Sequence, residues 1–357
     1  MSSQSHELPW LDQPLAHALR TRRAHALLVH GAQGVGQFEL ALALAQAWLC
    51  DAPDSPEVKA RACGVCANCK LVQARSHPDL LVLLPEALRE SMGWASEAID
   101  DAGEKASKAK PSKDIKVEAV RGVVAFAQTS SARGRGKVVV VHPAERMNAV
   151  AANTLLKTLE EPPGDARFVL SSAAPDALLP TIRSRCQALA LAVPDGGEAL
   201  AWLRGKGVER AEVLLRATGG QPLEALDWAG QGVEARLWDE LPRLVARGDG
   251  AALANWPLPR LVDALQKLCH DLHCRAAGAQ PRYFTQLPQA SDGALPALSA
   301  WAKALALAAR QAEHPWHAAL MTESLLQQGQ AALAAAGAAR TAPASTAEPV
   351  DSLNSGP

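Results

Sequence analysis

Aromatic side chains other than tryptophan are scarce in this sequence. It contains one Tyr and four Phe among 357 residues, beside nine Trp. The tryptophans lie far apart along the chain and form no group on which nucleotide bases could stack. Ala and Leu dominate instead, and both favour helix.

An excess of charge of either sign is also missing. Lys and Arg total 36 and Asp and Glu total 37, so the formal net charge is -1 at pH 7. An independent nucleic-acid-binding protein is usually strongly basic, which argues against that class but not against a subunit that meets DNA inside an assembly. The sequence contains no apolar signal core and no apolar run of about 18 residues. It therefore predicts a cytoplasmic protein with no membrane partner.

Four of the seven cysteines lie close together in the sequence. Cys63, Cys66 and Cys69 are spaced by two residues in CGVCANC, and Cys50 lies thirteen positions upstream of Cys63. Four thiolates at such spacing suit a closed tetrahedral Zn²⁺ site, which would be structural because no position is left for water. An unmetallated cluster of reduced thiols or a redox pair is the alternative.

Other possible ligands are weaker candidates. His77 precedes Pro78 at the start of a predicted strand and is interpreted as a turn residue. The remaining cysteines are dispersed and are expected to be small buried side chains: Cys186, Cys269 and Cys274.

Short apolar runs alternate with helical patterns over the first half of the chain. Strands are predicted at 24–30, 79–85, 137–141 and 167–172, and helices at 36–49, 116–129 and 149–161. Strands that alternate with helices indicate a parallel α/β sheet. Residues 86–114 are polar and have no apolar period, so they are predicted to form a surface loop.

After residue 193 the strand patterns stop and Ala/Leu-rich helical patterns follow. The predicted organisation is an α/β domain at 1–193 with a zinc module at about 50–69, then helical domains at 194–235 and 236–336. Residues 337–357 are rich in Ala, Pro and Ser and are predicted to be a disordered tail. Within the larger helical domain an apolar stripe is expected at Leu298, Trp301, Leu305 and Ala308.

A glycine-rich segment, GAQGVGQF, follows the first predicted strand. Gly31, Gly34 and Gly36 match the phosphate-binding pattern G-x-x-x-x-G-K-[ST]. The Lys position, however, holds Gln37, and the hydroxyl position that would bind Mg²⁺ holds Phe38. The loop therefore has the glycines of a phosphate-binding loop but lacks the side chains that would bind the phosphate and Mg²⁺.

Together, the motifs resemble those of a known family. GAQGVGQ, the cysteine module, NTLLKTLEEPP and SRC occur in an order similar to that of the bacterial clamp-loader AAA+ ATPases of DNA polymerase III. The resemblance covers about residues 20 to 190. It implies an AAA+ P-loop-type parallel sheet with an inserted zinc module, a small helical lid domain and a C-terminal helical collar that joins subunits in a ring.

Further positions depart from the ATP-hydrolysing members of that family. Those members carry Asp-Glu after the strand at 137–141, for Mg²⁺ and for the attacking water, whereas this chain has His142 and Pro143. Leu223 stands where they carry an Arg that reaches the γ-phosphate. Together with Gln37 and Phe38, these changes predict a site that does not turn over ATP and binds it in no productive way.

The arginine of the SRC motif is retained. The resemblance implies that Arg185, flanked by Ser184 and Cys186, reaches into the ATP site of a neighbouring subunit as an arginine finger. It also implies a non-catalytic subunit of a hetero-oligomer. Its partners would be the gamma/tau and delta subunits, the sliding clamp and primer-template DNA.

Two other functions remain open from the residues themselves. One is an ATP-binding AAA+ ATPase with an unorthodox loop, and the other is a zinc-dependent DNA-binding regulator. The basic segment ARGRGK at 132–137 could approach DNA phosphates, although a solvated turn is the interpretation favoured here.

Overall fold

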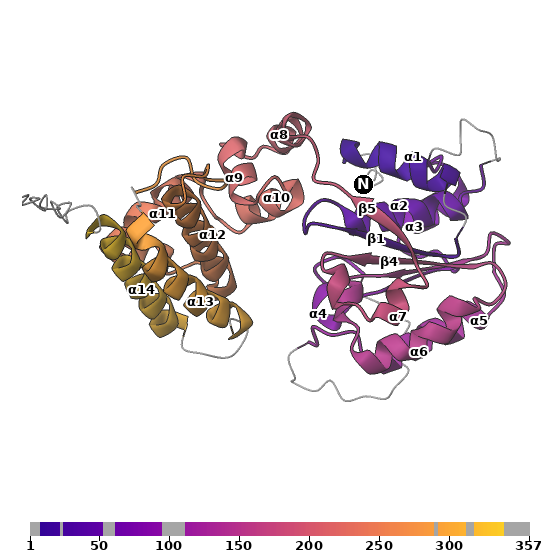
Figure 1. Cartoon of the computed structure of the whole chain (residues 1–357). Helices are drawn as coiled ribbons and strands as arrows, with labels where there is room; N and C mark the ends of the chain where they lie inside the picture. The colour runs from indigo at the N-terminus through magenta and orange to yellow at the C-terminus, as the bar shows by residue number, and fades with distance from the viewer. Residues whose placement is uncertain are drawn as a thin grey trace, which may run out of the picture. The chain divides into compact units, whose positions relative to one another are not determined.

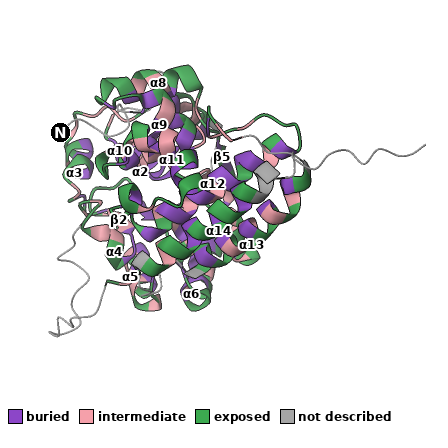
Figure 2. Cartoon of the chain, turned by 90° about the vertical axis from the view of Figure 1, so that its left-hand side faces the viewer, coloured by how far each residue is buried: buried purple, intermediate pink, exposed green. Residues whose placement is uncertain are grey.

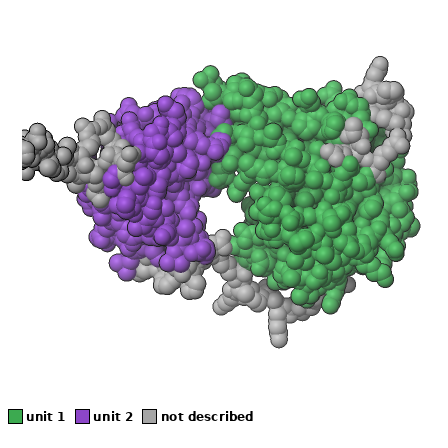
Figure 3. Space-filling model, viewed as in Figure 1, with its two compact units in different colours: residues 1–208, 220–227 green, residues 209–219, 228–357 purple. Residues whose placement is uncertain are grey.

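A computed structural model describes residues 8–21, 24–52, 61–94, 111–288, 292–311 and 318–338 (Figure 1). The chain divides into two compact units, coloured separately in Figure 3. The first comprises Met1–Val208 and Gly220–Asp227, and the second comprises Glu209–Gly219 and Trp228–Pro357. Most of the predicted polar loop (95–110) and nearly all of the predicted tail (339–357) lie outside the described residues.

The first unit contains a five-stranded parallel sheet, as the alternation of strands and helices predicts. The strand order is β2-β3-β4-β1-β5. The strands are β1 (Ala26–Gly31), β2 (Leu80–Leu83), β3 (Lys137–Val141), β4 (Ala166–Ser172) and β5 (Gln187–Leu191). All five residues of β3 are buried, as expected of a parallel strand that is covered on both faces.

Helices cover both faces of this sheet (Figure 1). One face packs against α1 (Asp12–Thr21), α2 (Gln37–Leu49) and α3 (Ala67–Gln73). The opposite face packs against α5 (Val117–Gln128), α6 (Ala149–Glu160) and α7 (Pro180–Arg183). The first unit also holds α8 (Gly196–Gly205) and a short helix α4 (Glu86–Arg89), so the predicted loop at 86–114 is partly helical.

Local sequence signals explain the bounds of α6 and the burial of α2. Asn148 caps α6, its Oδ1 accepting a hydrogen bond of 2.8 Å from the Ala151 amide. The helix ends at Glu160, just before the Pro162–Pro163 pair, which cannot continue it. Helix α2 is buried along nearly its whole length, which fits its almost uninterrupted apolar sequence.

The second unit is helical throughout the residues that the structure describes. Its helices are α9 (Ala211–Ala217), α11 (Ala235–Arg247), α12 (Leu258–Ala276), α13 (Leu295–Gln311) and α14 (Ala318–Ala338), and α10 (Pro222–Gly230) crosses the boundary between the units. Figure 2 shows buried and exposed residues alternating along α12, α13 and α14. The predicted stripe is confirmed, since all four of its residues are buried: Leu298, Trp301, Leu305 and Ala308. Among the described residues, no helix has the length and apolar content to cross a bilayer.

Candidate functional site

The glycine loop connects β1 to α2, the position that a phosphate-binding loop takes in this type of sheet. Gly31 ends β1, and Gly36 caps the N-terminus of α2. Gly34 and Gly36 have φ angles of 75° and 102°, a region that L side chains rarely adopt. The backbone of the cradle is therefore intact, and its glycines are required by its shape.

Gln37 bonds to the loop itself. Its side-chain Nε2 donates to the carbonyl oxygens of Gly31, at 2.8 Å, and Ala32, at 2.6 Å. The side chain is buried and carries no charge. A lysine at this position would offer a cation to a phosphate. The Gln37 amide instead donates both of its N–H groups to backbone carbonyls of the loop.

Phe38 and His142, at the two positions that the family resemblance assigns to metal handling, pack against each other. Their ring centroids lie 4.8 Å apart. The His142 Nδ1 lies 2.9 Å from the hydroxyl of Ser171 on β4. Burial lowers the pKa of His142 to about 4, although the nearby Glu145 carboxylate opposes that shift. The imidazole is therefore neutral at physiological pH, and an aromatic pair fills the place where oxygen ligands would hold Mg²⁺.

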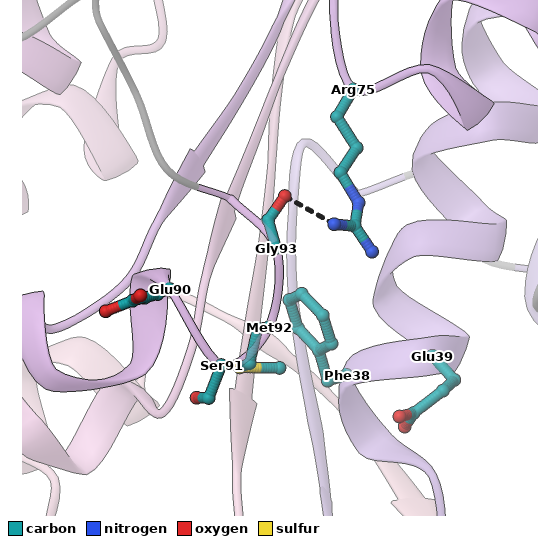
Figure 4. Close-up of a pocket in the computed structure, with 7 residues that line it drawn as sticks. All are labelled: Phe38, Glu39, Arg75, Glu90, Ser91, Met92 and Gly93. Carbon is teal, nitrogen blue, oxygen red and sulfur yellow. Dashed lines mark hydrogen bonds between the residues drawn. The ribbon is translucent and has the colours of Figure 1, made fainter.

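A cavity of about 340 Å³ opens beside this pair (Figure 4). Figure 4 shows Phe38 beside Met92, and the Arg75 guanidinium donating to the carbonyl of Gly93. Two carboxylates, Glu39 and Glu90, also line it. Burial raises the pKa of Glu39. One guanidinium against two carboxylates gives the cavity no excess of positive charge with which to hold a triphosphate.

Protein groups contact the glycine loop from two sides. The Leu223 amide, at the start of α10, donates to the Gly34 carbonyl at 3.0 Å. A Cβ on Gly34 would lie 2.8 Å from the amide nitrogen of Glu224, so the approach of α10 requires glycine there. On the other side, the indole of Trp10 donates to the carbonyl of Val35 at 2.8 Å and meets Trp202 edge-on at 5.3 Å.

The four predicted metal ligands come together in one cluster. The ligand atoms of Cys50, Cys63, Cys66 and Cys69 all lie within 4.8 Å of one another. The Cys50–Cys66 and Cys63–Cys69 sulfur pairs are each 3.9 Å apart. A tetrahedron with Zn–S bonds of about 2.3 Å has sulfur–sulfur edges of roughly 3.8 Å, so the donor set fits one tetrahedral ion. His77 is not a member of this cluster; its Nδ1 accepts from the Asp79 amide.

Backbone amides support the sulfur atoms. The amides of Cys63, Cys66 and Cys69 donate to Cys50, Cys63 and Cys66 Sγ respectively, each at 3.4 Å. Amide donors from Val65 and Cys66 lower the pKa of the Cys63 thiol to about 6, while burial raises the pKa of Cys50 and Cys69. Of the dispersed cysteines, Cys186 and Cys269 are buried as predicted, whereas Cys274 is only half-buried.

The basic segment at 132–137 begins as an exposed turn over 132–135, as predicted, and its arginines also contact the cysteine module. Arg135 donates to the carbonyls of Cys50 and Ala52, and Arg133 donates to the side-chain oxygen of Asn68. Two of its arginines therefore hold the cysteine module against the turn before β3. Sequence reasoning missed this role because the partners lie 65 to 85 residues away along the chain.

Asp79 anchors the same segment from inside the protein, a role that no local sequence pattern indicates. The fully buried carboxylate accepts from the amides of Ala132 and Arg133, both at 2.8 Å, and from Ser131 Oγ at 2.9 Å. The Lys137 ammonium lies 3.3 Å away. Burial alone would raise the pKa of Asp79, but these hydrogen bonds together lower it.

Arg185 lies just after α7 and is half-buried. Its Nε and Nη2 both contact the Glu160 carboxylate, and its Nη1 donates to the Thr181 carbonyl at 2.9 Å. The hydroxyl of Ser184 also donates to the Thr181 carbonyl, at 3.1 Å. Cys186 is buried, which raises the pKa of its thiol to about 12. These contacts hold the backbone of the motif and one edge of the guanidinium, while the Arg185 side chain as a whole remains 32% exposed.

Comparisons with known proteins agree with the motifs. The family described as "DNA polymerase III, delta subunit" matches residues 11–195. The chain is 37% identical over 269 residues to DNA polymerase III subunit delta' of Pseudomonas aeruginosa, which covers 71% of this chain and 74% of that protein. It is 32% identical over 281 residues to subunit delta' of Escherichia coli K12, covering 72% and 76%. It is also 32% identical over 173 residues to subunit tau of Salmonella typhimurium, covering 48% and 22%.

Proposed function

The chain belongs to the DNA polymerase III subunit delta' family, and on that premise we propose that it is a non-catalytic subunit of a bacterial clamp loader. In this role it would help to load the sliding clamp onto primed DNA during replication, in the cytoplasm. It would hydrolyse no ATP itself and would supply Arg185 to the ATP site of a neighbouring subunit.

The tilted packing of Phe38 against His142 carries the first half of the proposal. Hydrolysis needs a metal ion beside the phosphates and a group that activates water. The positions that would serve those needs hold the apolar ring of Phe38, the neutral imidazole of His142 and Pro143. The Gln37 side chain is hydrogen-bonded to its own loop. Nothing at these positions offers Mg²⁺ an anionic oxygen.

The partly exposed side chain of Arg185 supports the second half. A guanidinium presented in trans stabilises the charge on a transferring phosphoryl group and is worth about 10³–10⁵ in rate in other NTPases. The similarity to a tau subunit indicates that the chain shares its α/β architecture with other loader subunits. We therefore assign the partners as gamma/tau and delta, with the sliding clamp and primer-template DNA met inside the complex.

Two further assignments complete the proposal. The cysteine cluster binds one structural Zn²⁺ through Cys50, Cys63, Cys66 and Cys69, whose sulfur spacing fits that ion. Residues 194–235 act as the lid domain and 236–336 as the collar that joins the subunits.

A reconstituted loader tests the proposal. The isolated chain should hydrolyse no ATP above background. In the complete complex with clamp and primed DNA, Arg185→Ala should lower the ATPase rate in part, because only the site that faces this subunit loses its cation. Arg183→Ala is the matched control, since Arg183 lies in the same motif, is 38% exposed and pairs with Asp176. An unchanged rate for Arg185→Ala in a normally assembled loader would refute the trans-acting role.

A further inference from the structure

Glu160 occupies a position that is unfavourable for its own helix. It is the last residue of α6, and a second acid, Glu161, follows it. The carbonyl end of a helix carries partial negative charge, so carboxylates there are repelled. A cation nearby relieves that repulsion, and in this chain the cation is Arg185.

The contact fixes one edge of the guanidinium. Nε and Nη2 of Arg185 both reach the Oε1 atom of Glu160, while Nη1 reaches the Thr181 carbonyl. A free arginine side chain samples many rotamers. Contacts on two sides of the planar group restrict it to one orientation, and the Ser184 hydroxyl lies 3.4 Å from the same Nη1.

The backbone beneath Arg185 is held as well. Its amide donates to the Ile182 carbonyl at 3.1 Å. Ile182 and Cys186, the apolar residues that flank the arginine, are both buried in the core between the sheet and α6. The direction of the side chain is therefore set by the fold at its base and by Glu160 near its head.

A donor remains for an external ligand. A guanidinium carries N–H groups on all three nitrogens in a rigid fork. Glu160 uses the Nε edge, and the two N–H groups of Nη1 face the Thr181 carbonyl and the Ser184 hydroxyl, which leaves one N–H of Nη2 beyond these contacts. We propose that Glu160 is a positioning residue that orients Arg185 so that this remaining N–H faces the phosphates of a neighbouring subunit. This inference rests on the proposed function.

The chain provides a matched control for each half of the pair. Glu161 follows Glu160 directly and is exposed, so Glu161→Gln removes the same charge next to the pair. Arg183 forms its own ion pair, with Asp176, at 2.6 Å. A general effect of charge at this surface would appear in these controls too.

The experiment measures the Arg185-dependent rate, defined as the ATPase rate of the complete loader with clamp and primed DNA minus the rate of its Arg185→Ala form. Glu160→Gln should lower that rate about two- to fivefold, the range that one exposed ion pair supplies. The KM for ATP should not change, because orientation matters in the transition state. Glu160→Asp should retain more of the rate than Glu160→Gln, and Glu161→Gln should retain all of it.

The double variant separates positioning from folding. Glu160→Gln should have no further effect when Arg185→Ala is already present. An equal loss in both backgrounds would identify a structural role, and a higher rate for Glu160→Gln would show that Glu160 restrains Arg185 instead. Either result overturns the inference and leaves the proposed function standing. A null result for Arg185→Ala itself would refute the proposed function and the positioning role with it.

Discussion

Phe38 and His142 lie ring against ring, with their centroids 4.8 Å apart and their planes inclined by 34°. Phe38 is the second residue of α2, which follows the glycine loop, and His142 follows β3, so the two positions meet only in the folded protein. Because they contact, the two departures from the ATP-hydrolysing pattern form one packing unit. Restoring either position alone leaves the other without its partner.

Restoring the phosphate-binding loop should therefore cost stability without gaining nucleotide binding. Phe38→Thr removes a buried ring and should lower the free energy of unfolding by about 2–4 kcal/mol. Combined with Gln37→Lys it should still bind no ATP, since His142, Pro143 and Leu223 are unchanged. Denaturant unfolding and calorimetric titration with Mg-ATP measure the two effects, and Phe38→Leu is the control for loss of the ring alone. Tight ATP binding by the double variant would contradict this view of the site.

His142 should make the stability of the first unit depend on pH. Burial lowers its pKa from 6.5 to about 4, so below pH 6.5 the unfolded chain binds a proton that the folded chain does not. Stability from this group is complete above pH 6.5 and is lost as the pH falls to about 4, by up to about 3 kcal/mol. His142→Phe keeps a ring against Phe38 and should flatten the thermal unfolding profile between these pH values. Parallel profiles for the two proteins would show that His142 does not titrate in this way.

The purified chain should contain close to one zinc ion per molecule. Replacing Cys66 and Cys69 together by Ser should abolish it, because two ligands cannot hold a tetrahedral ion. Cys274→Ser, outside the cluster, should leave the zinc content unchanged. Metal analysis by mass spectrometry decides the matter, and a folded chain that lacks zinc would refute the assignment.

The second unit should carry the permanent contact with other subunits. Leu307 on α13 is 50% exposed, an apolar side chain of the kind that a stable interface covers. Leu307→Glu should weaken co-purification with the other loader subunits without changing the unfolding temperature of the isolated chain. Ala309→Glu places the same charge roughly 200° round the helix and serves as the control. Equal assembly of both variants would place the contact elsewhere.

The sequence predicted the strands best where both faces are covered. KVVVV at 137–141 is buried at every position and β-branched at the four valines, so its pattern was unambiguous. β5, with the sequence QALAL, was not predicted. It is an edge strand, and only two of its side chains are buried, Leu189 and Leu191, so its apolar pattern is short and weak. Short runs of this kind are hard to separate from helix by pattern alone.

The candidate sites also differ in how far they could be predicted from the sequence. The cysteine cluster follows from local spacing, since three of its ligands lie within seven residues of sequence. The partner of Arg185 lies 25 residues away, and those of Arg133 and Arg135 lie 65 to 85 residues away. Contacts at such separations form only when the strands assemble into the sheet, so no local sequence pattern predicts them.

Helix α2 links two of the features described above. Gly36 of the glycine loop is its N-cap and Cys50, the first cysteine of the cluster, is its C-cap, and its 13 residues span about 20 Å. At its first residue, the Gln37 side-chain amide donates to the carbonyl oxygens of the glycine loop. At its other end, the carbonyl of Cys50 accepts a hydrogen bond from Arg135. Both ends of α2 are therefore held by contacts within the first unit, and under the proposed function this subunit would offer its neighbours a fixed surface throughout their ATP cycle.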